Sequence, residues 1–372
     1  MKILFAAGGT GGHINPALAT AGEIRERYPD AEILFVGTKD KMEAKLVPAA
    51  GFDFATIKIS GFQRKLSIEN IIRNLKTIFY LLFCTFSVKK ILKKFKPDVV
   101  VGFGGYVSGP VVRTAAKMGI PTAIHEQNAY PGITNKTLAK IVDKVMLTAE
   151  EAEKYMQCKN PATVTGLPVR GEMLRADRDF ARAKLGIRDD QKLILSMGGS
   201  LGAMTINNAM VDLITDNYKD DSLYFIHAMG QYGLWVPDKL KEKGVDLDNA
   251  KNVELREYIS DMDVCMPAAD VVVCRAGASS LSELQALGKA SILVPSPNVA
   301  ENHQYHNAMA LVNKGAALII EEKDLTKEKM QSLFETLTKD DANRQSIEAN
   351  AKAMAVADAK EKIADIVLSL IK

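Results

Sequence analysis

The sequence predicts an α/β protein of two domains, each built on a parallel sheet. Its 372 residues suit two domains of about 100–200 residues each. Short apolar runs alternate with amphipathic stretches along the whole chain, as they do in strand–helix units. A buried strand, a glycine-rich loop and a helix follow one another twice, at residues 8–13 and 198–203. This repeat half a chain apart indicates two Rossmann-like domains that meet near residues 160–170.

Apolar runs of strand length, bounded by glycine, proline and polar residues, give the expected strands. In the first half they fall at residues 3–7, 33–36, 99–102, 122–124 and 145–147. In the second half they fall at residues 193–197, 223–227, 271–274, 292–294 and 317–320. Helices are expected between them, for example at residues 16–27, 203–217, 281–287 and 302–314.

Two domains follow from this order of elements, the first over residues 1–163 and the second over residues 164–348. An alanine-rich stretch at about 349–372 has a helical pattern. It either completes the second domain or packs back on the first.

The composition is that of a soluble globular protein, with 47% hydrophobic and 25% charged residues. Four cysteines lie far apart without a C-x-x-C pair, which argues against a disulfide framework or structural zinc. The apolar start at residues 1–7 is too short for a signal peptide, and no apolar run reaches the 18 or so residues of a spanning helix. A cytoplasmic location is therefore expected.

The net charge of +3 hides a split between the two halves of the chain. Residues 1–162 carry 23 basic and 14 acidic side chains, a balance of +9, and the remainder carries 25 and 31, a balance of −6. Residues 64–96 alone hold nine basic residues and one acid. The basic excess therefore has a local cause.

Within this basic segment, residues 78–83 are apolar on every face, which is more than one buried helix stripe requires. Apolar residues bordered by Lys and Arg are typical of surfaces that bind anionic lipid. The predicted membrane face consists of Arg73, Lys76, Phe79, Leu82, Phe83, Lys89, Lys90, Lys93 and Lys94. The alternative is a buried helix followed by a solvated basic one. Nucleic acid is not expected as a partner, because no aromatic stacking platform accompanies these charges.

The two repeated glycine loops point to a ligand at a helix N-terminus, where backbone N–H groups bind anions. Neither loop fits G-x-G-x-x-G or ends in G-K-[ST], so the dinucleotide and P-loop interpretations lose their main support. Contact with a phosphate or a sugar is favoured. The alternative is a tight turn that needs glycine for its backbone alone.

Three further loops also follow expected strands. In residues 275–283, Ser279 or Ser280 can cap a helix whose N–H groups suit a diphosphate. Glu283 lies one turn further on, where it either accepts two ribose hydroxyls or completes a capping box. The loops at 102–110 and 125–128 should converge with the first glycine loop, because ligands of parallel sheets bind at the carboxyl ends of strands.

A metal site is not expected. Asp261 and Asp263 form a D-x-D pair, but helix capping explains them better. Glu301, His303 and His306 lack a further ligand, and the start of a polar helix explains them.

Together these motifs resemble the MurG family within glycosyltransferase family 28, the undecaprenyldiphospho-muramoylpentapeptide β-N-acetylglucosaminyltransferases. The matching segments occur in order at residues 8–17, 102–110, 125–128, 168–170, 198–203, 277–283 and 303–308. The resemblance implies a GT-B fold, in which two Rossmann-like domains face each other across a deep cleft. It also implies UDP-N-acetylglucosamine as donor, lipid I as acceptor, and an inverted β-1,4 linkage in the products lipid II and UDP. Neither a cofactor nor a metal is implied, and the enzyme would lie peripherally on the inner face of the cell membrane.

The resemblance also assigns contacts with the donor, carried over motif by motif. The donor sugar would meet Thr10, Gly11, Gly12 and Asn128, the phosphates Arg170 and Ser200, and N-acetylglucosamine Gln304. The backbone of Ile259 would bind uracil, and the diphosphate and ribose would lie on Ala278, Ser279, Ser280, Leu281, Ser282 and Glu283.

Inversion needs one general base and a stabilised leaving group, without an enzyme nucleophile. His13 stands at the start of a helix, whose dipole favours the neutral imidazole that a base requires. Glu126 is the competing candidate. A purely structural role for His13 is the third interpretation.

Two other functions remain open from the sequence, and a third is the least expected. A hydrolysing UDP-N-acetylglucosamine 2-epimerase shares the fold and the nucleotide but needs no basic–apolar membrane face. A related glycolipid synthase acting on diacylglycerol would keep that face but lack the match at residues 125–128. A non-catalytic nucleotide-binding module is disfavoured, because two glycine-loop domains form a cleft for two substrates.

Overall fold

The computed structural model describes residues 1–59 and 84–371. These residues form two compact units, Met1–Pro168 with Asp358–Lys372, and Val169–Ala357. Arg73, Lys76, Phe79, Leu82 and Phe83 of the predicted membrane face lie outside the described residues.

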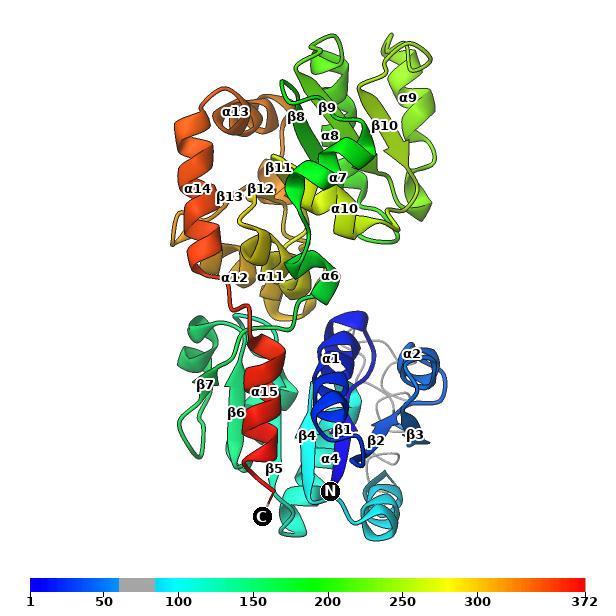
Figure 1. The fold of residues 1–372 in the computed structure, drawn as a ribbon, viewed down its shortest axis with the longest axis vertical. Coiled ribbons are helices and arrows are strands. Elements are labelled where there is room, and N and C mark those ends of the chain that lie inside the picture. Colours follow the sequence, from blue (N-terminus) through cyan, green and yellow to red (C-terminus); the bar gives the residue numbers. More distant parts are fainter. Residues whose placement is uncertain (60–83, 372) are drawn as a thin grey trace, which may run out of the picture. The chain divides into compact units, whose positions relative to one another are not determined.

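The first unit contains a parallel sheet of seven strands in the order β3-β2-β1-β4-β5-β6-β7 (Figure 1). Its strands are β1 Lys2–Ala6, β2 Glu32–Gly37, β3 Asp53–Thr56, β4 Val99–Gly102, β5 Thr122–Glu126, β6 Lys144–Leu147 and β7 Thr163–Val164. Its helices include α1 Gly11–Arg27, α2 Glu43–Ala49, α4 Gly105–Lys117, α5 Ile133–Leu138 and α15 Ala359–Leu368. Residues 84–95 are also helical, and a short 3-10 helix spans Glu150–Tyr155.

The second unit contains a parallel sheet of six strands in the order β10-β9-β8-β11-β12-β13. Its strands are β8 Lys192–Met197, β9 Leu223–Ala228, β10 Val253–Arg256, β11 Val271–Cys274, β12 Ala290–Leu293 and β13 Leu318–Ile319. Its helices are α6 Gly171–Leu174, α7 Arg178–Leu185, α8 Met204–Asn217, α9 Val236–Glu242, α10 Met262–Ala268, α11 Ala278–Leu287, α12 His303–Val312, α13 Lys327–Thr338 and α14 Asp341–Ala353. Short 3-10 helices span Gln231–Gly233, Ala300–Asn302 and Glu322–Asp324.

The predicted class, α/β with two parallel sheets, is confirmed, and the expected strands are all present. Three strands were missed by sequence reasoning: β3, β7 and β10. They are the outer strands β3 and β7 of the first sheet and the outer strand β10 of the second. None of their residues is fully buried, and they include polar residues, so these three strands carry no continuous apolar run.

The central strands are apolar because helices cover both faces of each sheet. In β1, Leu4 packs into one core of the first unit, whereas Ile3 and Phe5 pack into the core on the opposite face. Phe5 stacks on Phe35 of β2 with ring centroids 5.1 Å apart. This alternation fixes the register of the strands and therefore the position of the loops at their carboxyl ends.

The strand order reverses between β1 and β4 in the first sheet and between β8 and β11 in the second. At such a switch point the loops after the two strands diverge to opposite faces and leave a ligand crevice. The loops after β1 and β4 nevertheless touch at one point, where a Cβ on Gly105 would lie 2.2 Å from the Gly8 carbonyl oxygen. Gly105 has φ +77°, so glycine is required there for both space and conformation.

The C-terminal region differs from the single helix predicted at residues 349–372. It forms two helices, α14 in the second unit and α15 in the first, separated by residues 354–358. In Figure 1, α15 lies beside α1, and its Ile363, Ala364 and Val367 are buried in the core that α1 also lines. Lys360 of α15 pairs with Glu23 of α1 at 2.7 Å.

A buried ion cluster ties the amino ends of β8 and β11 to α7. Asp270 precedes β11 and accepts hydrogen bonds from Arg182 Nη1 at 3.0 Å and Arg178 Nη2 at 2.6 Å. It also accepts one from the Leu193 backbone N–H at 2.8 Å. The side chains of Asp270 and Arg182 are each 5% exposed, so each charge depends on the other for compensation.

Asp270→Asn should therefore destabilise the second unit by about 3–5 kcal/mol, because Arg182 would stay buried without its counter-charge. Urea denaturation followed by circular dichroism measures the change in the free energy of unfolding. The matched control is Asp190→Asn, which breaks the exposed Arg188–Asp190 pair and should leave the transition unchanged. Equal transitions for Asp270→Asn and the wild type would contradict the role given to this cluster.

Candidate functional site

His13 lies at the start of α1, immediately after the first glycine loop. Its Nδ1 is 3.1 Å from the Gly8 carbonyl oxygen and 3.3 Å from Thr10 Oγ1. A carbonyl oxygen only accepts, so Nδ1 carries the proton of the neutral ring. The ring nitrogen left with a lone pair is then Nε2. Thr10 occupies the N-cap position of α1 without a side-chain capping hydrogen bond, and Gly11 and Gly12 are the first two residues of the helix.

The loops after β1, β4 and β5 converge in the first unit, as the strand order predicts. A Cβ on Gly104 would lie 2.8 Å from His13 Cδ2, 3.0 Å from His13 Nε2 and 3.5 Å from Gln127 Oε1. Gln127 Nε2 in turn donates to the Phe103 carbonyl oxygen at 3.1 Å. Gly104 therefore lies against the His13 ring, and Gln127 lies beside Gly104.

Glu126, the second predicted base, is 2% exposed at the end of β5. Its carboxylate accepts hydrogen bonds from the Asn128 backbone N–H at 2.9 Å, Asn128 Nδ2 at 3.1 Å, the Gly132 N–H at 3.2 Å and Asn135 Nδ2 at 2.8 Å. Burial raises the pKa of Glu126, and these hydrogen bonds act in the opposite direction. The contacts shape the loop that carries Asn128.

His125 is completely buried beside Glu126 and stacks on Phe103 with ring centroids 5.3 Å apart. Burial lowers the pKa of His125 to about 4, so the ring is neutral at physiological pH. Its Nε2 lies 2.9 Å from the Gly166 carbonyl oxygen and therefore donates to it. His125 thus links the end of β5 to the segment that follows β7.

Sequence reasoning missed Glu43, a fully buried carboxylate at the start of α2. It accepts hydrogen bonds from the Gly9 N–H at 3.0 Å, the Thr38 N–H at 3.0 Å and the Thr38 hydroxyl at 2.6 Å. Burial alone would raise the pKa of Glu43, but these hydrogen bonds lower it below the ordinary value. Glu43 lies 34 residues from Gly9, and no local motif marks it.

In the second unit, Ser200 lies in the glycine loop between β8 and α8. The loop is held against the segment after β9, where the Tyr232 N–H donates to the Leu201 carbonyl oxygen at 3.0 Å. The Gln231 N–H donates to the Ser200 carbonyl oxygen at 3.3 Å. A Cβ on Gly202 would lie 2.2 Å from the Met229 carbonyl oxygen, so only glycine fits this approach.

The first six residues of α11 are the predicted diphosphate and ribose segment, Ala278 to Glu283. Glu283 pairs with Arg170, whose Nε and Nη2 both lie 3.0 Å from Glu283 Oε1. The Glu283 side chain is 15% exposed and that of Arg170 is 51% exposed. Burial raises the pKa of Glu283, and the Arg170 charge opposes the shift. Two residues predicted for one nucleotide therefore lie in direct contact.

A cavity of about 410 Å³ opens beside the second glycine loop. Apart from Met204, its lining residues are polar or small. The lining consists of Gly198, Gly202, Ala203, Met204, Thr205, Arg275, Ser296, Asn298, Gln304 and Glu322. Gln304, predicted for N-acetylglucosamine, is among them, and its Oε1 accepts a hydrogen bond from the Ser296 N–H at 2.9 Å. A polar cavity of this size suits a sugar.

Arg275 and Glu322 in this cavity were also missed. They form an ion pair, and Glu322 Oε1 accepts a hydrogen bond from the Thr205 hydroxyl at 2.7 Å. Arg275 Nη1 donates to the Val294 carbonyl oxygen at 3.0 Å. The signal for Arg275 was its place directly after the apolar strand β11, where site residues of parallel sheets gather.

Two further expectations concern single residues and metals. Ile259, predicted for uracil, lies between β10 and α10 and is 4% exposed, so any contact with uracil would come from its backbone. Asp261 stands at the start of α10, where its carboxylate pairs with Arg256 Nη1 at 2.7 Å instead of capping the helix. Within residues 1–59 and 84–371, no group of three or more His, Cys, Asp or Glu side chains is placed to hold a metal.

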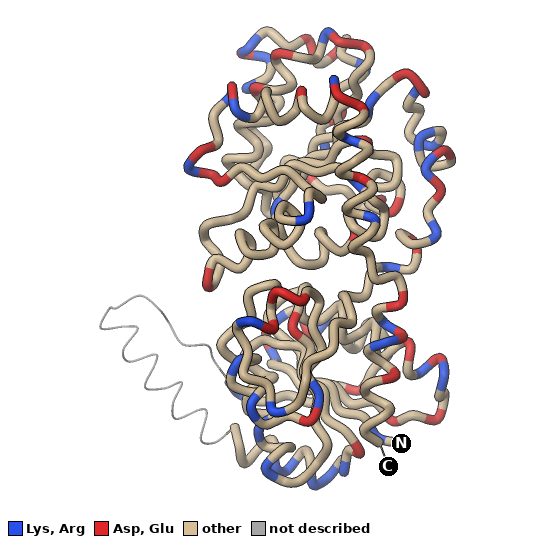
Figure 2. Tube along the Cα trace, turned by 90° about the vertical axis from the view of Figure 1, so that its left-hand side faces the viewer, with Lys and Arg blue, Asp and Glu red and all other residues tan. Residues whose placement is uncertain are grey.

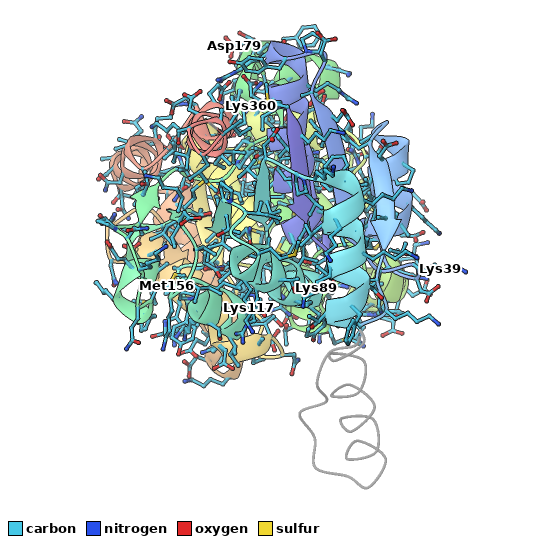
Figure 3. The ribbon with its side chains drawn as sticks, turned by 90° about the horizontal axis from the view of Figure 1, so that it is seen from below. Lys39, Lys89, Lys117, Met156, Asp179 and Lys360 are labelled. Carbon is cyan, nitrogen blue, oxygen red and sulfur yellow. The ribbon has the colours of Figure 1, made fainter. Side chains whose placement is uncertain are left out.

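The described part of the predicted membrane face is the helix at residues 84–95. Cys84, Val88 and Leu92 are buried at intervals of four residues, whereas Lys89, Lys90, Lys93 and Lys94 are exposed. Phe86 is 74% exposed. Figure 2 shows basic positions gathered along this segment, and Figure 3 labels Lys89 on it. Among the described residues, no helix is long and apolar enough to cross a membrane.

Comparison with known proteins gives two family matches. The glycosyltransferase family 28 N-terminal domain matches residues 3–147, and the glycosyltransferase family 28 C-terminal domain matches residues 193–366. An Acetivibrio thermocellus protein is 45% identical over 372 residues, which cover 100% of this chain and 99% of that protein. That protein is named UDP-N-acetylglucosamine–N-acetylmuramyl-(pentapeptide) pyrophosphoryl-undecaprenol N-acetylglucosamine transferase.

Solved structures agree with these matches. Acinetobacter baumannii MurG has a TM-score of 0.81 to this chain at 29% identity, over 99% of both chains. The UDP-GlcNAc 2-epimerase from Neisseria meningitidis has a TM-score of 0.66 at 15% identity, over 99% of this chain and 100% of that one, which shows a shared fold alone. The GT-B fold class predicted from the sequence is confirmed. Since the two family models together span most of its length, the chain belongs to glycosyltransferase family 28.

Proposed function

We propose that this enzyme transfers N-acetylglucosamine from UDP-N-acetylglucosamine to the C4 hydroxyl of the muramoyl sugar of lipid I. The products are lipid II and UDP, and the new β-1,4 linkage has inverted configuration. The observation that carries the proposal is the end-to-end similarity, at 45% identity, to an enzyme whose name states this acceptor and this sugar. The polar cavity and the glycine loops at both switch points are consistent with it.

The second unit would hold the donor. Helices α8 and α11 begin at the carboxyl ends of β8 and β11, so the N–H groups of their first turns are available to phosphate oxygens. Ser200 lies in the loop before α8, and Arg170 is positioned by Glu283 beside α11. These dipoles and the Arg170 charge would stabilise the UDP leaving group. Gln304, at the cavity, would contact the N-acetyl sugar.

The first unit would supply the general base. As the acceptor hydroxyl attacks the anomeric carbon, it must lose its proton. His13 presents Nε2 as the unprotonated nitrogen of a half-buried ring at the convergence of three loops. Glu126 is already occupied by four hydrogen bonds from Asn128, Gly132 and Asn135. We therefore assign His13 the proton transfer and Glu126 the shaping of the Asn128 loop.

The lysines of residues 84–95 would hold the enzyme on the anionic inner face of the cell membrane, where a lipid-linked acceptor resides. Each lies on the exposed side of a helix whose other side is buried, so their charges face outward. Basic side chains of this kind bind acidic headgroups, and an exposed aromatic such as Phe86 inserts at the interface.

The function is tested by incubating the protein with UDP-N-acetylglucosamine and a lipid I analogue and measuring UDP release. Release that requires the analogue supports the transferase. Release without any acceptor, accompanied by N-acetylmannosamine, would identify a 2-epimerase. Release that requires diacylglycerol would identify a glycolipid synthase.

His13→Ala should lower kcat by at least about a hundredfold, because a positioned general base contributes roughly 10²–10⁴-fold. UDP affinity, measured by calorimetry, should be unchanged, because the UDP contacts are assigned to the second unit. Turnover at the wild-type rate in this variant would remove His13 from the mechanism.

Glu283→Ala should weaken UDP binding roughly 10- to 100-fold, because a hydrogen bond to a charged group contributes about 1.5–3 kcal/mol. The control is Glu348→Ala, which removes a carboxylate paired with Arg344 at 2.9 Å on α14 and should leave UDP affinity unchanged. Calorimetric titration with UDP measures both. Undiminished affinity in Glu283→Ala would refute the ribose assignment.

Replacing Lys89, Lys90, Lys93 and Lys94 by Glu should lower partitioning onto phosphatidylglycerol vesicles by roughly a hundredfold or more. The control reverses the same number of exposed lysines in the second unit, Lys184, Lys219, Lys241 and Lys251, and should retain most binding. Co-sedimentation at fixed ionic strength compares the two. Equal binding by both variants would leave residues 84–95 as an ordinary solvated face.

A further inference from the structure

Glu43 and His13 contact opposite edges of one peptide group. The Gly9 N–H donates to Glu43 Oε2 at 3.0 Å, and the carbonyl oxygen of Gly8 lies 3.1 Å from His13 Nδ1. This N–H and this carbonyl belong to the same peptide unit, which joins Gly8 to Gly9. In a planar trans peptide the two groups point in opposite directions, so the peptide lies between the carboxylate and the imidazole.

The peptide has little freedom to turn away from this arrangement. Gly9 has φ +91°, a backbone conformation that glycine adopts readily and that other residues rarely do. A Cβ on Gly8 would lie 2.7 Å from Glu43 Oε1, and a Cβ on Gly37 would lie 2.5 Å from Glu43 Cγ. The carboxylate therefore fits closely between the ends of β1 and β2.

Thr38 fixes the other side of the carboxylate. Its N–H and its hydroxyl both donate to Glu43 Oε1, at 3.0 Å and 2.6 Å. Oε1 is thereby held by the end of β2, and Oε2 is left to the glycine loop. The carboxylate connects two strand ends through its two oxygens.

We infer that Glu43 is a positioning residue for the glycosyl transfer, acting through the Gly8–Gly9 peptide to hold His13 in the Nδ1–H form with Nε2 unprotonated. The carboxylate polarises and orients the peptide, whose carbonyl then accepts the Nδ1 proton. The catalytic consequence of this positioning rests on the proposed function, since the tautomer of His13 affects the rate only if His13 is the base. Glu43 contributes to the rate without touching either substrate.

Glu43→Gln replaces one carboxylate oxygen by an amide NH₂ of nearly the same volume. In the wild type the Gly9 N–H and the Thr38 N–H each donate to one of the two carboxylate oxygens. In Glu43→Gln one of these N–H groups faces the side-chain NH₂, which is also a donor, and loses its acceptor. The Gly8–Gly9 peptide should shift, and the neutral His13 ring should populate both tautomers. We expect kcat to fall about tenfold, within the contribution of a positioned base, while UDP affinity stays within about twofold.

The matched control is Asp143→Asn in the same unit. Asp143 accepts hydrogen bonds from the Thr122 N–H at 2.9 Å and the Thr122 hydroxyl at 3.3 Å, much as Glu43 does from Thr38. Thr122 begins β5, so this contact lies at the amino ends of the strands, opposite the site. Asp143→Asn should lower the Tm yet leave kcat and the His13 tautomer unchanged.

The direct readout is the ring ¹⁵N spectrum of histidine in the full-length protein at a pH where His13 is neutral. The His13 signals are assigned by their loss in His13→Ala, among five histidines in all. Wild-type signals showing a protonated Nδ1 and an unprotonated Nε2, with mixed tautomers in Glu43→Gln, support the inference. The wild-type spectrum alone can overturn the inference, so the inference stays testable even if Glu43→Gln fails to fold.

A wild-type ring protonated on Nε2 would overturn the inference, as would Glu43→Gln with wild-type kcat and tautomer. A loss of kcat in Asp143→Asn equal to that in Glu43→Gln would reduce Glu43 to a structural residue. Wild-type turnover by His13→Ala would overturn the catalytic consequence, whereas a wild-type enzyme inactive with lipid I would overturn the proposed function. The ring spectra separate these last two results from a failure of the Glu43 geometry.

Discussion

Parallel strand order is the constraint on which the site depends. In both sheets the order reverses beside the first strand of the unit, between β1 and β4 and between β8 and β11. At each reversal the loops after the two strands diverge and leave a crevice, and glycine lets the backbones come close wherever loops of neighbouring strands still touch. Gly105 lies against the Gly8 carbonyl in the first unit, and Gly202 lies against the Met229 carbonyl after β9 in the second. Each glycine loop is therefore required by a close backbone approach, and it is also a candidate ligand-binding loop.

Much of this architecture is readable from sequence because the central strands are buried on both faces. Continuous apolar runs such as Val99–Gly102 and Val271–Cys274 predict these strands directly, and the glycines after β1 and β8 mark the starts of the following helices. The outer strands β3, β7 and β10 have no comparable run, and their pairing is set by neighbours far away in the chain. The break between α14 and α15 was also missed, because an alanine-rich pattern does not show which unit each helix packs against.

The residues of the candidate site also divide into those that a local sequence pattern marks and those that only distant contacts reveal. Residues inside recognisable motifs, such as His13, Glu283 and Gln304, could be named as candidates from the sequence. The structure brings Arg170 to Glu283 and Gln304 to the cavity. Glu43 and Glu322 could not, because their importance lies in partners 34 and 117 residues away. Glu126 was identified by its motif, but its buried hydrogen bonds favour a supporting task over proton transfer. A motif names residues that matter, whereas their contacts distinguish reacting groups from those that hold them.

We propose that this chain is an inverting glycosyltransferase with a general base in one unit and a donor site in the other. The stereochemistry of the product tests it most directly. With UDP-N-acetylglucosamine ¹³C-labelled at C1 and a lipid I analogue, the one-bond coupling at C1 reports the configuration of the new linkage. A β-linked disaccharide on the muramoyl C4 oxygen is the predicted product. An α-linked product, or labelled sugar released without attachment to the acceptor, would contradict the account.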